Sequence, residues 1–224
     1  MRKPLAKNDV IERLRKYQTS GGFIYAQDQI AGPPYFDICH EYVLENCIDM
    51  APRIRGINRI ERKRPYKVKR KTIALADRTP SGRDEERYVL AMFEWHRRTG
   101  HNHKLLGELI DYQVPIKNSP KDEGAGKVDF ISVIDHFLYL HEIKAFKSRE
   151  SILKAILEVQ TYYQQIVHER LIGDFGLTGI KGIKKSVVIF NGSELHKQID
   201  NPKVQELLKL FEIELFILDA EEFV

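Results

Sequence analysis

The chain has 224 residues, of which 42% are hydrophobic and 30% are charged, and its formal net charge is +4. This composition is typical of an ordinary globular protein, and two cysteines exclude a disulfide-rich framework. No apolar run follows the basic first residues and none approaches the length of a membrane span, so we expect a cytoplasmic protein with no membrane contact.

The first eighty residues predict a small N-terminal module, separate from a domain over residues 81–224. Asn8 or Asp9 can cap a first helix, and Asp37 can cap a second. After Pro52 the pattern alternates and predicts two strands, one containing Arg53-Ile54-Arg55 and one over residues 66–69. Helices followed by a basic β-hairpin are typical of a winged-helix-like DNA-binding module, which is our hypothesis for residues 1–80.

Positive charge is concentrated in this predicted hairpin. Residues 53–71 hold ten lysines and arginines and one acid, whereas residues 194–224 hold eight acids and three lysines. A local basic block binds nucleic-acid phosphates through counterion release even when the whole chain is nearly neutral. A solvated charged hairpin is the alternative. The candidate nucleic-acid-binding residues are Arg53, Arg55, Arg59, Arg62, Lys63, Arg64, Lys67, Lys69, Arg70 and Lys71.

The second part of the chain predicts an α/β domain with a mixed sheet. Its elements are expected in the order helix, three strands, helix and strand. The segments are a helix over 84–97, strands over 105–116, 128–133 and 137–144, a helix from Ser148, a strand over 186–190, a short helix over 202–211 and a strand over 213–218. Only Asp135-His136 separates the second and third strands, which predicts a tight antiparallel hairpin.

Two acids and a lysine converge on this hairpin. Glu142 and Lys144 are two residues apart in a strand, so their side chains share one face. The partner strand brings Asp129 near the register of Lys144 or Ala145, within a residue or two. Clustered carboxylates repel one another unless a cation neutralises them, and oxygen ligands suit Mg²⁺ or Mn²⁺. A neighbouring lysine could orient or deprotonate a water molecule that attacks phosphorus, or stabilise the charge that develops there.

These residues resemble the motif of the PD-(D/E)XK nuclease superfamily over about residues 83–192. The resemblance implies a restriction-endonuclease-like core with Asp129, Glu142 and Lys144 at the active site. It also implies the carbonyl of Ile143 as a metal ligand and an acid from the first helix, for which we select Glu86, with Glu85 as the alternative. Val128 replaces the proline that names the motif. Gln160 is a candidate for an accessory catalytic role, because some relatives carry a glutamine on this helix.

The resemblance implies a Mg²⁺- or Mn²⁺-dependent endonuclease that hydrolyses phosphodiester bonds in DNA. Glu86, Asp129 and Glu142 would hold the metal, and Lys144 would position the attacking water. The alternative is a non-catalytic nucleic-acid-binding or interaction protein on the same fold. The acidic C-terminal region could bind the basic block of a second copy, so a homodimer is compatible with the sequence, as is a partner protein. RNA in place of DNA stays open, as do the substrate structure and the biological pathway.

Overall fold

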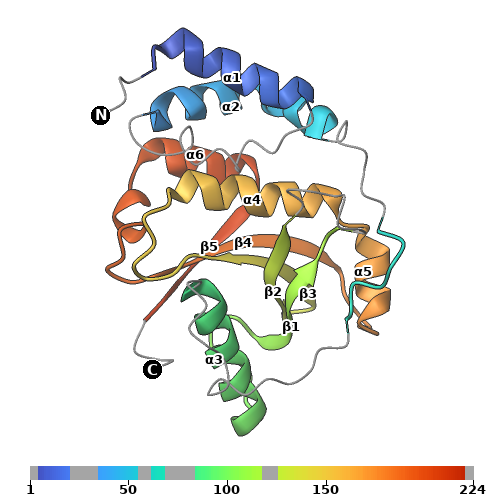
Figure 1. Cartoon of the computed structure of the whole chain (residues 1–224). Helices are drawn as coiled ribbons and strands as arrows, with labels where there is room; N and C mark the ends of the chain where they lie inside the picture. The colour runs from blue at the N-terminus through green and yellow to red at the C-terminus, as the bar shows by residue number, and fades with distance from the viewer. Residues whose placement is uncertain (1–4, 21–34, 55–61, 69–83, 118–125, 220–224) are drawn as a thin grey trace.

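The structure is a computed structural model that describes residues 5–20, 35–54, 62–68, 84–117 and 126–219. In these ranges the chain forms one mixed β-sheet with helices on both faces (Figure 1). This confirms the predicted α/β class with a mixed sheet. Across the described ranges, no helix has both the length and the apolar character needed to cross a membrane.

The sheet has five strands in the order of the sequence. They are β1 (Glu108–Pro115), β2 (Lys127–Ile134), β3 (Phe137–Ile143), β4 (Gly182–Phe190) and β5 (Ile213–Leu218). β1, β2 and β3 form an antiparallel meander, and β4 and β5 then add in parallel to β3. The parallel additions require crossovers, and helices supply them between β3 and β4 and between β4 and β5.

The turn between β2 and β3 fixes the position of the whole hairpin. Asp135 and His136 have φ angles of 48° and 68°, and Ile134 pairs directly with Phe137. Two consecutive residues with positive φ form the turn whose twist matches that of the flanking strands. The predicted two-residue hairpin is therefore confirmed.

Helices cover the two faces of the sheet unequally. α4 (Ile152–Gln165) and α6 (Pro202–Leu210) lie on one face, together with the N-terminal helices (Figure 1). α3 (Asp84–Thr99) lies on the other face, where Val89 and Met92 pack on apolar residues of β2, β3 and β4. A short helix, α5 (His168–Asp174), follows α4.

α4 begins later than the sequence pattern predicts. Its N-cap is Ser151, whose hydroxyl accepts a hydrogen bond from the backbone N–H of Lys154, whereas Ser148 was the expected cap. Glu150 consequently precedes the helix instead of lying in its first turn. This difference of three residues places Glu150 in the loop that leaves β3.

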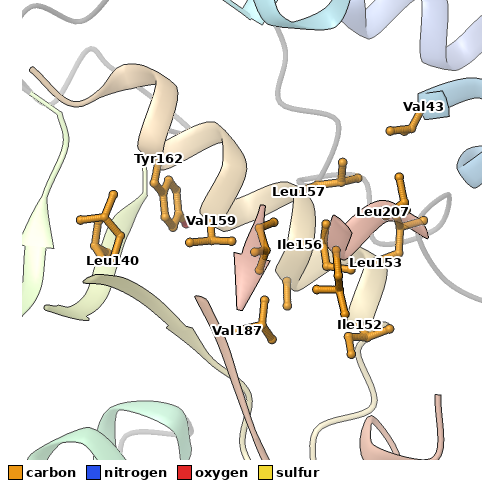
Figure 2. Packing of buried hydrophobic residues seen from close by; sticks show 14 of the residues in the cluster. Val43, Leu140, Ile152, Leu153, Ile156, Leu157, Val159, Tyr162, Val187 and Leu207 are labelled. Atoms are coloured by element: carbon orange, nitrogen blue, oxygen red, sulfur yellow. The ribbon is translucent and has the colours of Figure 1, made fainter. Parts of the chain in front are cut away.

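α1 (Lys7–Ser20) and α2 (Phe36–Ile54) pack on the outer side of α4. Figure 2 shows Leu157 of α4 directed toward Val43 of α2, while Val159 of α4 lies on the sheet side near Leu140 and Val187. One continuous apolar cluster therefore joins the N-terminal helices, α4 and the sheet. The predicted boundary at residues 80–81 falls in the undescribed segment 69–83.

The structure corrects the predicted N-terminal hairpin. α2 continues to Ile54, so the strand expected at Arg53-Ile54 is wrong and the pair is helical. Residues 62–68 contain no strand either. They run along α5, where the backbone N–H of Tyr66 donates to Asp174 and the Tyr66 hydroxyl accepts from the backbone of Val167. Burial of the Tyr66 ring holds this segment in place.

Candidate functional site

The hairpin places two acids opposite each other at one end of the sheet. Phe130 pairs with His141, and continuing that register by one residue brings Asp129 opposite Glu142. This is two residues from Lys144, within the predicted range. The Asp129 carboxylate also accepts a hydrogen bond of 3.0 Å from the backbone N–H of Ile143. The structure thus brings together the acids and the lysine that the strand pattern predicts.

Lys144 is bound by three carboxylates. Its ammonium lies 2.8 Å from Glu142 Oε1, 2.7 Å from Glu158 Oε2 and 2.8 Å from Glu150 Oε2. The residue is only 3% exposed, so solvent screens these contacts weakly. Burial alone would lower the pKa of Lys144, but the carboxylates of Glu142, Glu158 and Glu150 raise that pKa well above its ordinary range. Lys144 is therefore a fixed, fully charged group.

Asp129 and Glu142, the two acids of the hairpin beside Lys144, are shifted toward their uncharged form. Burial raises the pKa of Asp129 to about 7, although Lys144 and the N–H of Ile143 act against this shift. Burial also raises the pKa of Glu142 well above its usual value, and the nearby charges of Asp129 and Glu158 add to that effect. Carboxyl groups held this close together resist simultaneous ionisation. The pair therefore favours either a shared proton or a second cation.

α3 contributes an acid to the site, but it is the residue next to the one that the sequence analysis selects. Burial raises the pKa of Glu85, whereas Lys144 and a hydrogen bond from the backbone of Ala145 lower it. Glu85 is among the strongest charged neighbours of Asp129 and of Lys144, and Glu86 is not. The structure therefore favours Glu85, the alternative, as the acid of α3 at this site.

α4 also contributes an acid that the sequence analysis does not predict. Glu158 of α4 contacts Lys144, whereas the predicted accessory residue Gln160 accepts a hydrogen bond of 2.9 Å from Lys185. Sequence reasoning missed Glu158 and Glu150. One signal was present, because Glu158 is an acid within the apolar run of α4, and the structure buries it. Gln160 stays a candidate only through its position on the same helix.

His141 lies on the opposite face of β3, as its place between Leu140 and Glu142 predicts. It is fully buried, and its ring nitrogens are 2.7 Å from the Ser132 hydroxyl and close to that of Ser186. Phe130 stacks on the ring at 4.2 Å between centroids. Burial lowers the pKa of His141 to about 3, so the imidazole is neutral. Its role is packing and hydrogen bonding within the core.

The basic segment divides into a buried part and an exposed part. Arg62 is 4% exposed and donates 3.1 Å from Nε to the carbonyl of Pro65, and its guanidinium also bonds the carbonyl of Lys117. A guanidinium bound by carbonyls in this way is poorly placed for a phosphate contact. Lys63, Arg64 and Lys67 are exposed. The side chains of Arg53, Arg55, Arg59, Lys69, Arg70 and Lys71 lie outside the described residues.

The carboxylates around Lys144 form a donor set whose fit to a hard divalent cation depends on their arrangement and on their charge. Among the described residues, no three acidic, histidine or cysteine side chains are already arranged as a metal site. Two features nevertheless suit a cation. Glu142 Oε2 is buried with no hydrogen-bond partner in the described part of the chain. Among the described residues, the ion pairs and charge interactions of the acids Glu85, Asp129, Glu142, Glu150 and Glu158 involve two lysines, Lys144 and Lys154, which leaves three negative charges uncompensated by lysine if all ionise. Carboxylate oxygens of this kind fit Mg²⁺ or Mn²⁺.

Comparisons of the chain with protein-family models, with curated proteins and with solved structures found no match.

Proposed function

We propose that this protein is a metal-dependent nuclease of the PD-(D/E)XK type that hydrolyses phosphodiester bonds in DNA. The observation that carries the proposal is the buried Glu142 Oε2 beside Asp129, which no donor of the described residues reaches and which has the Glu158 carboxylate as a neighbour, within a group of acids that exceeds its lysines. A buried carboxylate oxygen without a partner is costly unless a cation or proton satisfies it. A divalent cation bound there would remove that cost.

The order of the elements supports the same proposal. α3 is followed by the antiparallel strands β1, β2 and β3, then by α4 and by β4 parallel to β3. This is the order that a restriction-endonuclease-like core requires. Asp129 on β2, Glu142 on β3 and Lys144 directly after β3 occupy the positions of the family motif. The match of topology and motif together is more specific than either alone.

Asp129, Glu142 and Glu85 would hold the metal, with the carbonyl of Ile143 as a further candidate. When bound, Mg²⁺ or Mn²⁺ supplies Lewis-acid polarisation of the scissile phosphate and lowers the pKa of a coordinated water. Lys144, charged and held 2.8 Å from Glu142, would donate a hydrogen bond to the attacking water or to a phosphate oxygen in place of its bond to Glu142, whose carboxylate the metal would take. Glu158 and Glu150 would hold the Lys144 ammonium in place through their contacts of 2.7 and 2.8 Å.

Nucleic acid would contact the exposed cations of the segment that runs along α5. Lys63, Arg64 and Lys67 point to solvent while Arg62 anchors the segment internally. Lysine and arginine at such positions bind the phosphate backbone without reading bases. The affinity should therefore fall steeply with salt concentration.

A second function, binding of nucleic acid without cleavage, is favoured by one observation. The ammonium of Lys144 already contacts Glu142, Glu150 and Glu158 at 2.7 to 2.8 Å and offsets part of their negative charge. An internal cation can stabilise a carboxylate cluster without any metal. On this alternative the cluster is structural, and divalent cations change neither the stability of the protein nor any phosphodiester bond.

The experiment is a cleavage assay on plasmid, linear duplex, single-stranded DNA and RNA, with Mg²⁺, Mn²⁺ or EDTA. We expect metal-dependent cutting by the wild type and none by Glu142→Ala. Glu194→Ala is the matched control, since it removes an exposed acid paired only with a lysine on the surface, and it should cut at the wild-type rate. Cutting by Glu142→Ala at the wild-type rate would refute the site. Nucleic-acid binding without cutting of any substrate would favour the second function.

A further inference from the structure

A cavity of about 680 Å³ lies at the end of the sheet where β4 and β5 begin, bordered by α4 and α6. Ile183, Leu208 and Ile213 give it apolar walls, and Tyr163, Gln205 and Lys185 add polar groups. This volume falls within the range of about 300–1,000 Å³ that small-molecule sites occupy. None of the residues of the carboxylate cluster lines the cavity, so it is a separate feature.

Lys185 is the unusual residue of this cavity. It is 7% exposed, its ammonium donates 2.9 Å to Gln160 Oε1 and it lies 4.5 Å from the centre of the Tyr163 ring. In the described part of the chain, no carboxylate lies within ion-pair distance of it. An ammonium has three N–H donors, so a single amide acceptor leaves donors available. Burial of a charge with so little compensation is costly, and an anion in the cavity would reduce that cost.

The charges around Lys185 at the mouth of the cavity balance one another. Lys184 is directed to the opposite face of β4 and is paired with Glu214 at 2.7 Å. Lys209 and Glu212 are both exposed at the cavity. Burial lowers the pKa of Lys185, and only the charge of Glu212 acts against that shift. Because the surrounding lysines and glutamates cancel, the available ammonium of Lys185 supplies the net positive charge, which suits a ligand with a single anionic group.

We propose that this cavity binds a small organic anion, with one carboxylate or phosphate group on an apolar or aromatic body, and that Lys185 is its anchor. The ammonium of Lys185 bonds the anionic group, and Gln160 orients the ammonium from behind. Ile183, Leu208 and Ile213 contact the apolar body. This site is independent of the carboxylate cluster and of the nuclease proposal.

The test is a titration of the full chain with benzoate, phenyl phosphate, inorganic phosphate or neutral benzyl alcohol. Binding is measured by the NMR chemical shifts of the backbone amides. We expect benzoate or phenyl phosphate to shift residues of the cavity and to bind about tenfold or more tightly than benzyl alcohol, because a charged hydrogen bond is worth roughly 1.5–3 kcal/mol. A stronger response to phenyl phosphate than to benzoate identifies a phosphate ligand, and the reverse identifies a carboxylate. Inorganic phosphate alone should bind more weakly, since it lacks the apolar body.

Lys185→Met should lose that tenfold preference, whereas Lys184→Met should keep it, because Lys184 is paired elsewhere. If no organic anion binds the wild type, or if Lys185→Met binds as the wild type does, the proposal is overturned.

A second measurement does not depend on the fold of the variant. Acetic anhydride modifies lysines of the wild type, and mass spectrometry reads each site. The bound anion should slow acetylation of Lys185 severalfold relative to Lys184, and equal rates with and without the anion would also overturn the proposal.

Discussion

Two lysines, Lys144 and Lys185, are buried against α4, and they differ in the number of carboxylates beside them. Lys144 has three carboxylates within 2.8 Å, and Lys185 has an amide oxygen and an aromatic ring. The pKa of Lys144 is raised by those carboxylates despite burial, whereas burial lowers the pKa of Lys185. The same side chain is therefore a permanent cation at one place and a titratable amine at the other. Burial alone does not decide the state of a lysine; the number of acids beside it does.

The largest effect should follow from removing the cation with three partners. Lys144→Met leaves Glu142, Glu150 and Glu158 without their common partner, and breaking a buried ion pair from one side costs roughly 3–5 kcal/mol. Urea unfolding at pH 8 measures this loss. It should shrink at pH 5, because Asp129 and Glu142 have raised pKa values and can take up protons. Lys197→Met, at an exposed pair, is the control and should change stability by less than about 0.5 kcal/mol. A Lys144→Met protein as stable as that control would contradict the assigned contacts.

The acids beside Lys144 should make the protein less stable as the pH rises. Asp129 keeps its proton up to pH about 7 in the folded state, whereas an unfolded aspartate releases it near pH 4. The folded state thus binds more protons in this window, and its stability falls between pH 4 and 7, on the order of 4 kcal/mol, in metal-free buffer. Asp129→Asn should show a smaller decline, because the part due to Asp129 is gone while Glu142 keeps its raised pKa.

Addition of Mg²⁺ at pH 8 tests whether a divalent cation binds beside Asp129. A cation bound only by the folded state raises the melting temperature, and the rise grows with the logarithm of the cation concentration once that exceeds the dissociation constant. We expect Mg²⁺ to stabilise the wild type and to have no effect on Asp129→Asn in a thermal melt. An equal response of both proteins to Mg²⁺ would place the cation elsewhere.

A smaller effect is expected at the lysine without acidic partners. Lys185→Met replaces a poorly compensated buried ammonium by an apolar side chain of similar length, which is often neutral or stabilising by about 1 kcal/mol. Since the folded pKa of Lys185 is lowered, the unfolded state binds more protons as the pH approaches 10.5, and wild-type stability rises there. The variant should lose this rise. A loss of stability comparable to that of Lys144→Met would remove the distinction between the two lysines.

The smallest effect should come from Glu150, the most exposed partner of Lys144. Its side chain is 34% exposed and also pairs with Lys154. Partly exposed ion pairs contribute up to about 1 kcal/mol, so Glu150→Gln should cost between 0.5 and 1 kcal/mol in chemical denaturation. Glu158→Gln, at a buried position, should cost more. The reverse order would mean that the loop before α4 holds Lys144 more firmly than the helix does.

Local chemistry was sufficient to predict much of the fold. The two-residue turn at Asp135-His136 fixes the hairpin, and the period of two along β3 places Glu142 and Lys144 on one face. The topology of the five strands follows from these segments and the helical crossovers. Sequence alone also identified Asp129 as the partner across the hairpin, at a register that lies within two residues of Lys144, as expected.

The remaining parts of the site depend on tertiary packing. Glu158 and Glu150 reach Lys144 only because α4 returns across the sheet, and no spacing along the chain encodes that approach. The choice between Glu85 and Glu86 depends on the rotation of α3, which a short apolar stripe specifies only to within one residue. The alternation over Arg53-Ile54-Arg55 predicts a strand, but three residues of this pattern also fit the end of a helix, which is what the structure has at Arg53 and Ile54.

The position of α4 has a consequence for how the protein can be handled. Its inner side packs on the sheet and Leu157 on its outer side contacts the N-terminal helices (Figure 2). A fragment that starts at residue 81 would therefore present an apolar surface to water, and we expect it to aggregate on expression unless α1 and α2 are supplied as a separate chain. The same burial predicts that the amide hydrogens of α4 exchange with deuterium more slowly than those of α3, which is covered on one side only.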